Sequence, residues 1–269
     1  MKKQLFLALI TGILLLMPFM NFGQAPPLGT TAGFALFSAS GAFNEQGSAS
    51  TVTGDVGTNV GAFNLFPPGT LIGQKHVADA TSAQAAIDVA AAYNSLLGRT
   101  CGSTHGVGLG GGETLGPNVY CLTAASTLTG NLNLDGSGDP NAIFIFKING
   151  AFATAAGSTV TLNNSASLCN VFWQVNGEVD LGSGSVFNGT IVANGAINLL
   201  AGATLHGRGL TQAGAVNLNN NTVTIASCAP APPGTVPTLS EWGLIIFGVL
   251  LLGIGAIYIL RRKQTSFPI

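Results

Sequence analysis

The stretch VFWQVNGEVDLGSGSVFNGTIVANGAINLLAGATLHG (residues 171–207) contains a turn motif that recurs along the chain. The motif is a dipeptide ending in glycine, and its copies are spaced by 27, 18 and 19 residues: Asn149-Gly150, Asn176-Gly177, Asn194-Gly195 and Ala213-Gly214. Seven positions after these glycines come further turn residues: Gly157, Gly184, Gly202 and Asn221. Each period therefore reads as strand, turn, strand, turn, strand, with Gly or Asn where a positive φ is needed. Such units must stack to bury an apolar face, which predicts a mostly β solenoid; a β-sandwich, the alternative, does not explain the phase of the glycines.

Alternation of side chains along each strand assigns three faces to the solenoid. On the strand before each Asn-Gly, the side chains expected to point inward are Phe146, Ile148, Trp173, Val175, Ile191 and Ala193. Apolar residues between them then point outward and need a cover: Ile145, Phe172, Val192 and Leu210. The strand after each Asn-Gly faces out with polar residues that are typical of solvated surface: Glu178, Asp180, Asn198 and Asn217.

An alanine-rich segment, residues 77–98, is expected to form a long helix that covers the outward apolar residues. Thr81 and Gln84 have the spacing of a capping box, and Gly98 suits the C′ position. The face expected to pack against the solenoid consists of Ala83, Ile87, Ala90 and Leu97.

The third strand of each period carries outward threonine and asparagine. The outward positions are Thr159/Thr161, Val186/Asn188, Thr204/His206 and Thr222/Thr224, with Asn131/Asn133 and Thr51/Thr53 in the same local pattern. Stacked rungs would place these side chains about 4.8 Å apart. A rigid, uncharged array of hydroxyls and methyls suits a periodic, uncharged surface such as ice, although threonine is also simply favoured in strands.

Both ends of the chain are apolar and are set aside from the folded domain, residues 26–229. A basic start and an apolar run predict a signal peptide over 1–25, with a retained N-terminal anchor as the alternative. A Pro-rich linker, 230–241, precedes an uncharged stretch, 242–260, that is long enough to span a bilayer as a helix. The basic tail, 261–269, should stay on the cytoplasmic side.

Composition excludes several classes of function. Only 7% of the residues are charged, and the folded domain has four basic residues against nine acidic ones, so a nucleic-acid partner is not expected. Four cysteines in an exported chain indicate two disulfides. Three pairings are open, of which Cys101–Cys121 and Cys169–Cys228 are favoured because they would close the Gly-rich loop and pin the last strand. Scattered histidines and the lack of a C-x2-C pair argue against zinc, and no metal or other cofactor is expected.

Several ordered segments resemble one bacterial and fungal family. GFALFSASGAFNEQGSASTVTGDVGTNVGAF (33–63), FPPGTLIG (66–73), LGPNVYCL (115–122), DPNAIFIFKI (139–148) and nearly all of 169–224 look like the ice-binding family called DUF3494. Separately, VPTLSEWG (236–243), the apolar stretch and the basic tail resemble an IPTL-type C-terminal sorting signal. That second resemblance implies an exported protein routed to the cell envelope, held there or released after the tail is processed.

The DUF3494 resemblance implies an irregular, right-handed β-helix with a helix alongside and a small cap, here about 99–121. It also implies that the first rung packs beside the last, so that Thr51 and Thr53 would neighbour Thr222 and Thr224. The expected ice-binding residues are Thr51, Thr53, Asn133, Thr159, Thr161, Asn188, Thr204, Thr222 and Thr224. The T-A/G-x-T/N pattern of family ice sites is absent in regular form here, which leaves the choice of face open.

Two rival functions come from other classes. An exported β-helix that cleaves polysaccharides needs a groove with clustered carboxylates, and the acids here have no basic partner set, so an enzyme is not expected. An envelope adhesin that binds a neutral glycan or another cell remains the alternative. We expect a monomer whose partners are ice and, through the tail, the envelope membrane or sorting machinery.

Overall fold

The computed structural model describes residues 25–47, 49–64, 68–225, 228, 248–249 and 252–253. The chain divides into two units, Met1–Ser227 and Cys228–Ile269. Of the second unit only Cys228 and two short helical stretches are described, so the expected linker, membrane-spanning helix and basic tail lie almost wholly outside the described residues, as does the signal peptide. Among the residues that the structure does describe, none forms a helix of sufficient length and hydrophobicity to cross a bilayer.

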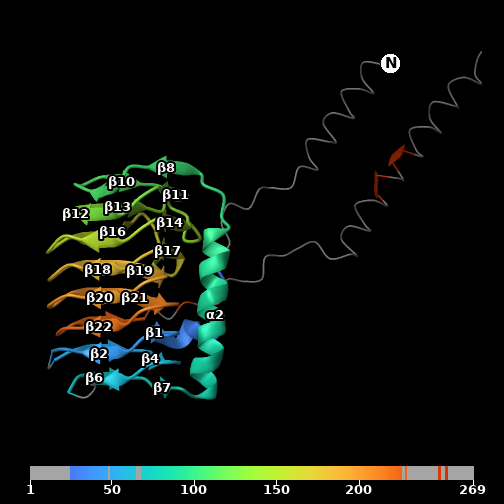
Figure 1. Cartoon of the computed structure of the whole chain (residues 1–269). Helices are drawn as coiled ribbons and strands as arrows, with labels where there is room; N and C mark the ends of the chain where they lie inside the picture. Colours follow the sequence, from blue (N-terminus) through green and yellow to red (C-terminus); the bar gives the residue numbers. More distant parts are fainter. Residues whose placement is uncertain are drawn as a thin grey trace, which may run out of the picture. The chain divides into compact units, whose positions relative to one another are not determined.

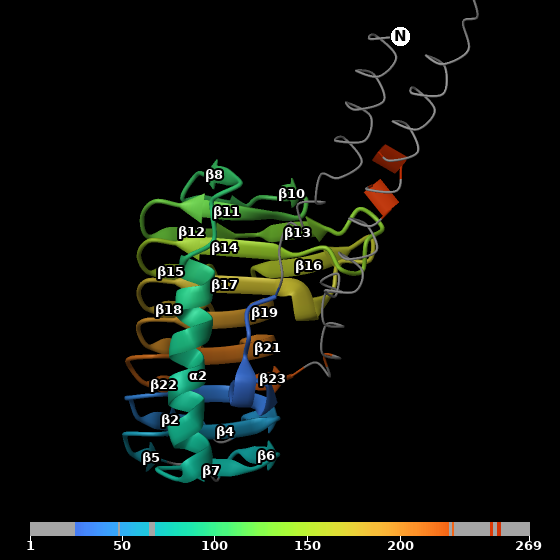
Figure 2. The same cartoon turned by 90° about the vertical axis from the view of Figure 1, so that its right-hand side faces the viewer.

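The first unit is a stack of short parallel strands with three faces (Figures 1 and 2). We call one face the amide face, after the asparagine side chains that it carries. It is an eight-stranded sheet, in spatial order β5 (Phe63–Asn64), β2 (Phe43–Glu45), β22 (Val216–Leu218), β20 (Ile197–Leu199), β18 (Val179–Leu181), β15 (Phe152–Thr154), β12 (Ser126–Thr129) and β9 (Gly108–Gly110). The other two faces share a fifteen-stranded sheet that folds around a corner, because β19 (Val186–Ala193) and β21 (Thr204–Thr211) each contribute to both.

The threonine face contains β6 (Thr70–Ile72), β3 (Thr51–Thr53), β23 (Thr222–Thr224), the first halves of β21 and β19, β16 (Thr159–Asn163), β13 (Asn131–Asp135) and β10 (Thr114–Leu115). The helix-covered face contains β7 (Lys75–Val77), β4 (Asp55–Thr58), β1 (Phe34–Ser38), the second halves of β21 and β19, β17 (Val171–Val175), β14 (Phe144–Ile148), β11 (Asn118–Leu122) and β8 (Ser103–His105). Short 3-10 turns lie at Gly29–Gly33 and Leu168–Asn170. This arrangement is a β-helix.

The order of the rungs along the stack differs from their order in the sequence. The first rung, β1–β2–β3, lies between the last rung and the second one: β2 pairs with β22 and β5, and β3 pairs with β23 and β6. The helix α2 (Ala80–Leu97) then carries the chain along the stack to the far end, where β8, β9 and β10 begin the return (Figure 1). The predicted pairing of Thr51 with Thr222 and of Thr53 with Thr224 is confirmed.

The interior is a column of apolar side chains, and all six residues predicted to point inward belong to it. Its centre is a run of stacked aromatic rings: Tyr120 on Phe146 at 5.3 Å between centroids, and Phe146 on Trp173 at 4.0 Å. The buried indole N–H of Trp173 donates to Asn188 O at 3.1 Å. Inward positions in successive rungs are mostly apolar because each lies directly above its neighbour.

Glycine serves two different purposes at the corners. Gly157, Gly184 and Gly202 have φ of 68°, 64° and 71° with open space around them, so the backbone conformation itself requires glycine, as predicted. In the last rung the positive φ falls on Asn220, one residue before the predicted Asn221. Gly207, where β21 turns from one face to the next, has a positive φ of 139° and is confined by packing as well: a Cβ there would lie 1.9 Å from Gly189 O in the rung above.

Helix α2 covers the outward apolar residues Ile145, Phe172, Val192 and Leu210, as predicted. Its rotation differs from the prediction. The buried helix residues are Ser82, Ala85, Val89, Ala92, Tyr93 and Leu96, whereas Ile87 is 63% and Leu97 is 49% exposed. Alanine on every side makes the apolar pattern nearly uniform, so specific contacts decide the rotation; among them, the Tyr93 hydroxyl donates to Asn176 Oδ1 at 3.0 Å.

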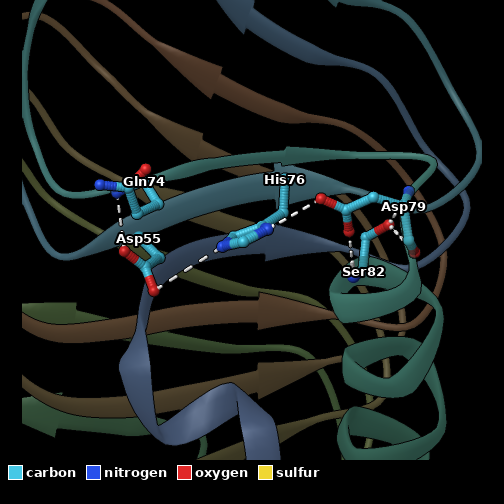
Figure 3. Close-up of polar contacts among 5 residues, drawn as sticks. All are labelled: Asp55, Gln74, His76, Asp79 and Ser82. Carbon is cyan, nitrogen blue, oxygen red and sulfur yellow. Dashed lines mark hydrogen bonds and ion pairs between the residues drawn. The ribbon is translucent and has the colours of Figure 1, made fainter.

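The N-terminus of α2 is held by a polar network (Figure 3). Asp79, not the predicted Thr81, is the N-cap: its carboxylate accepts from the backbone N–H of Ser82 at 2.7 Å, and the Ser82 hydroxyl accepts from the N–H of Asp79 at 2.8 Å. His76 Nδ1 lies 2.8 Å from Asp79 Oδ2, and His76 Nε2 lies 4.0 Å from Asp55 Oδ2. The Ser82 N–H and His76 together lower the pKa of Asp79.

The C-terminus of α2 is held by a half-buried cation. Lys147 of β14 donates from Nζ to Arg99 O at 2.6 Å, beside the last turn, where unpaired helix carbonyls favour positive charge. Burial lowers the pKa of Lys147. Gly98 is the C-cap residue itself with φ −72°, so the predicted left-handed C′ glycine is not formed. The helix is thus pinned at both ends to strands of the face it covers.

We predict that Asp79→Ala lowers the thermal midpoint at pH 7, because the N-cap and its contact with His76 are lost. The folded-state pKa of Asp79 is lowered, so its stabilisation is present above the unfolded pKa of about 3.9 and disappears as the pH falls through the folded value. The wild type and the variant should therefore converge in acid, as followed by circular dichroism melts at several pH values. Thr81→Ala, at the neighbouring position, should leave the midpoint unchanged; an equal drop would mean that Asp79 is not the cap.

We also predict that Gly207→Ala lowers the free energy of unfolding by more than about 4 kcal/mol, because its Cβ would meet backbone that cannot move aside. The matched change Gly202→Ala adds a methyl group in open space at positive φ and should cost about 1–2 kcal/mol. Urea unfolding of the two variants distinguishes these effects. Equal losses would contradict close stacking at the Gly207 corner.

Candidate functional site

The threonine face carries two columns of outward side chains, held in register by the backbone ladder. The first column runs Thr70, Thr51, Thr222, Thr204, Val186, Thr159, Asn131. The second runs Ile72, Thr53, Thr224, His206, Asn188, followed beyond a break by Thr161, Asn133 and Thr114. All nine predicted ice-binding residues lie on this face and are at least partly exposed. The sequence pattern therefore located a real array of side chains.

Some members of the array were missed at the sequence level. Thr70 is exposed and Ile72 is 60% exposed, and both lie on the end strand β6. A signal for them exists, because TLIG (70–73) repeats the threonine-to-glycine spacing of TVTG (51–54) and TLHG (204–207). Thr114 on β10 is also exposed and pairs with Asn133 at the opposite end of the face.

The columns are interrupted between β16 and β19. These strands share only the pair Thr159–Val186, whereas β13 and β16 are paired at five consecutive positions. The side chain of Asn188 fills the gap by donating from Nδ2 to Val160 O at 2.6 Å. The stacked spacing expected from the sequence is therefore interrupted at this joint, because an asparagine side chain replaces most of the backbone ladder there.

The two parts of the threonine face also differ in hydrogen bonding. The part above the break contains β16, β13 and β10, and the part below it contains β19, β21, β23, β3 and β6. Above the break, Asn131 Oδ1 accepts from the hydroxyls of Thr159 and Thr161, at 2.7 Å each, and Asn131 Nδ2 donates to Asn133 Oδ1 at 2.7 Å. Below the break, no side-chain hydrogen bond within the described part of the chain involves Thr51, Thr53, Thr70, Thr204, Thr222 or Thr224. Their hydroxyls are left to solvent.

The amide face is more ordered than simple solvated surface. Nδ2 of Asn64 donates to Asn44 Oδ1 at 2.9 Å, Asn44 to Asn217 at 2.7 Å, and Asn217 to Asn198 at 2.6 Å. Asn198 Nδ2 in turn lies within 2.6 Å of a carboxylate oxygen of both Glu178 and Asp180. The predicted outward residues are thus joined across the rungs into a chain of amides that ends in two negative charges.

Titratable side chains elsewhere brace the ends of the stack. The His76–Asp79–Asp55 network anchors the helix, and Asp55 Oδ1 also accepts from Gln74 N at 2.7 Å (Figure 3). At the other end, His105 Nε2 lies 3.1 Å from Glu113, whose other oxygen accepts from Gly110 N. These carboxylates are engaged in local structure. Within the described ranges, no three His, Cys, Asp or Glu side chains are grouped to hold a metal ion.

The predicted cap region, about 99–121, contains β8, β9, β10 and most of β11. The predicted disulfide Cys101–Cys121 is confirmed, with 5.8 Å between the Cα atoms. Cys169 and Cys228 are each disulfide-bonded as well. The disulfide of the cap joins the lead-in to β8 to β11 at the end rung, where fewer strand neighbours hold the chain.

Comparison with known proteins identifies the family to which the sequence of this chain is similar. The sequence profile of a family described as ice-binding-like matches residues 37–224, nearly the whole β-helix. The chain belongs to this ice-binding-like family. An ice-binding protein of Nostoc sp. is 36% identical over 244 residues, covering 89% of this chain and 87% of the relative. One from Flavobacterium frigoris is 33% identical, covering 74% and 75%.

Solved structures of the ice-binding-like family share the fold. An ice-binding protein from an Antarctic biological consortium has a TM-score of 0.73 at 35% identity, covering 78% of this chain and 96% of that one. An ice-binding protein from the ascomycete Antarctomyces psychrotrophicus has a TM-score of 0.73 at 33% identity, covering 76% and 100%. Separately, the IPTL-CTERM motif matches residues 236–263, at the predicted sorting signal.

Proposed function

We propose that the protein adsorbs to ice through the threonine face and thereby inhibits ice growth and recrystallisation. Membership of the ice-binding-like family supports the activity. The observation that supports this face is its pair of outward columns, rich in hydroxyls and methyls, which the backbone keeps in register over the five rungs below the break. In the five rungs below the break, the outward strand positions carry a single titratable side chain, His206.

Adsorption to ice requires a surface that loses little conformational entropy when it matches a fixed lattice. Strand backbones hold each threonine in place, and its β-branched side chain is stiff at χ1, so little freedom is lost on docking. Rungs about 4.8 Å apart present a regular repeat to a crystal of water. The amide face is also regular, but its amides bind one another and it carries Glu178 and Asp180, which hold their own hydration.

We further propose that the stack is right-handed and that the protein acts as a monomer without cofactor or catalytic activity. The apolar start, 1–25, would direct export, and the segment that matches the IPTL-CTERM motif would route the domain to the cell envelope, with 242–260 as a membrane-spanning helix. A tethered ice binder would attach a cell to ice, so that adhesion and ice binding are the same activity at the cell surface.

We predict that Thr204→Tyr weakens ice binding by at least about tenfold, a loss of about 1.4 kcal/mol, because the larger ring lifts the face off the lattice. The measurements are partitioning of purified protein into slowly grown ice and the concentration that stops recrystallisation. Asn198→Tyr is the matched control, since it adds comparable bulk to the amide face. Circular dichroism melts of both variants should match those of the wild type.

The opposite result would relocate the site. If Asn198→Tyr removes activity and Thr204→Tyr does not, ice binds to the amide face and our choice of face is wrong. If the wild-type protein neither enters ice nor shapes crystals, but binds neutral oligosaccharides on a glycan array, the protein is an adhesin and the proposed function fails.

A further inference from the structure

The threonine face consists of two surfaces with different chemistry, separated by the break between β16 and β19. We infer that ice contacts only the lower one, through a surface that we call the hydroxyl platform, formed by β6, β3, β23 and the first half of β21. The first half of β19 borders this platform, but its outward residues, Val186 and Asn188, carry no hydroxyl. The inference rests on the proposed function and assigns two further residues to the site, Thr70 and Ile72. The upper surface, around Asn131 and Asn133, is a brace that holds its own strands together.

The hydroxyls of the hydroxyl platform are available to water. The first platform column is Thr70, Thr51, Thr222 and Thr204, and the second is Ile72, Thr53, Thr224 and His206. A threonine hydroxyl has one donor and two acceptor sites and rotates to suit its partner. Because these hydroxyls bind no other side chain in the described structure, each can take the orientation that a lattice water requires.

The hydroxyls of the brace already donate to another side chain. Thr159 and Thr161 both donate to the single oxygen Asn131 Oδ1, which fixes the direction of both protons. Asn133 completes the network by accepting from Asn131 and donating to the backbone oxygens of Gly112 and Glu113 at 3.2 Å. A lattice water that needs a donor at this surface would have to displace a satisfied hydrogen bond, with little net gain, and the hydroxyls cannot turn to suit the lattice without losing that bond.

Backbone geometry separates the two surfaces in the same place. The platform strands are paired at three consecutive positions across every junction, which keeps both columns in line over four rungs. Beyond β19 only one pair connects to β16, so the second column has no backbone register with Thr161. A planar lattice can match one continuous surface more readily than two that are joined at a single position.

The end strand β6 extends the platform by a full rung. Thr70 lies beside Thr51 and repeats the first column, and Ile72 lies beside Thr53 and contributes an apolar side chain to the second. Both are well exposed at this end of the stack. The ligand is therefore a sheet of ordered, ice-like water that spans four rungs, from Thr204 to Thr70, with hydroxyls as anchors and methyls between them.

Two exposed threonines at opposite ends of the face give a matched test with the full-chain protein. Thr70→Tyr should weaken ice partitioning and inhibition of recrystallisation by about tenfold or more, whereas Thr114→Tyr on β10 should change them by less than about twofold. Equal losses from both variants would show that the whole face binds ice and would overturn the division. No loss from Thr70→Tyr alongside a large loss from Thr204→Tyr would remove β6 from the site.

Removal of single hydroxyls separates binding from bracing. Thr222→Val should reduce ice binding several-fold and leave the thermal midpoint within error, because its hydroxyl binds no other group in the described structure. Thr159→Val should lower the midpoint and leave ice binding intact, because its hydroxyl binds Asn131. The reverse pattern would overturn the inference. If Thr204→Tyr, Thr70→Tyr and Thr222→Val all leave ice binding intact, ice does not bind to the threonine face and the proposed function is wrong in its choice of face.

Discussion

The parallel pairing of the first rung with the last is the constraint on which the rest of the structure depends. Thr51 pairs with Thr222, 171 positions later in the chain, and the neighbouring strands β1 and β2 make equally distant pairs with β21 and β22. Without this insertion the lower end of the stack would have no β3 or β6, and the threonine columns would end at β23. Helix α2 makes the order possible, since it carries the chain from the inserted rungs to the far end. Contacts this distant have a large entropic cost of loop closure, which the apolar column and the covered face together must offset.

Much of this architecture follows from local rules that the sequence displays. Alternation placed Phe146, Trp173 and Ile191 inside and Phe172 and Val192 beneath the helix, because a strand reverses its side chains at every residue. The rotation of α2 could not be obtained in this way. Alanine occurs on all sides of the helix, so hydrophobicity hardly distinguishes one face from another, and the deciding contacts, Asp79 with Ser82 and Tyr93 with Asn176, depend on where the strands lie.

The candidate site, like the fold, could be predicted from the sequence only in part. The repeat placed all nine predicted residues on one face, and the resemblance to a known family supplied the pairing of Thr51 with Thr222. The break at Asn188 was not predictable, because its side chain occupies a ladder position that the sequence assigns to backbone. Thr70 was missed although its strand belongs to the second rung, because TLIG (70–73) has isoleucine where TVTG (51–54) has its second threonine.

Side-chain chemistry explains why two faces with the same rung spacing behave differently. An asparagine carries both a donor and an acceptor at the end of a planar amide, so stacked asparagines can bond across the rungs, as Asn44, Asn217 and Asn198 do. A threonine hydroxyl is shorter and cannot reach the side chain of the next rung by itself. Among the described residues of the threonine face, threonine hydroxyls donate to another side chain only above the break, where Asn131 accepts from Thr159 and Thr161. The same β-helix therefore carries an amide face whose side chains bind one another and a hydroxyl platform whose hydroxyls bind no other side chain in the described structure, and this difference is why we propose the platform as the surface that orders water.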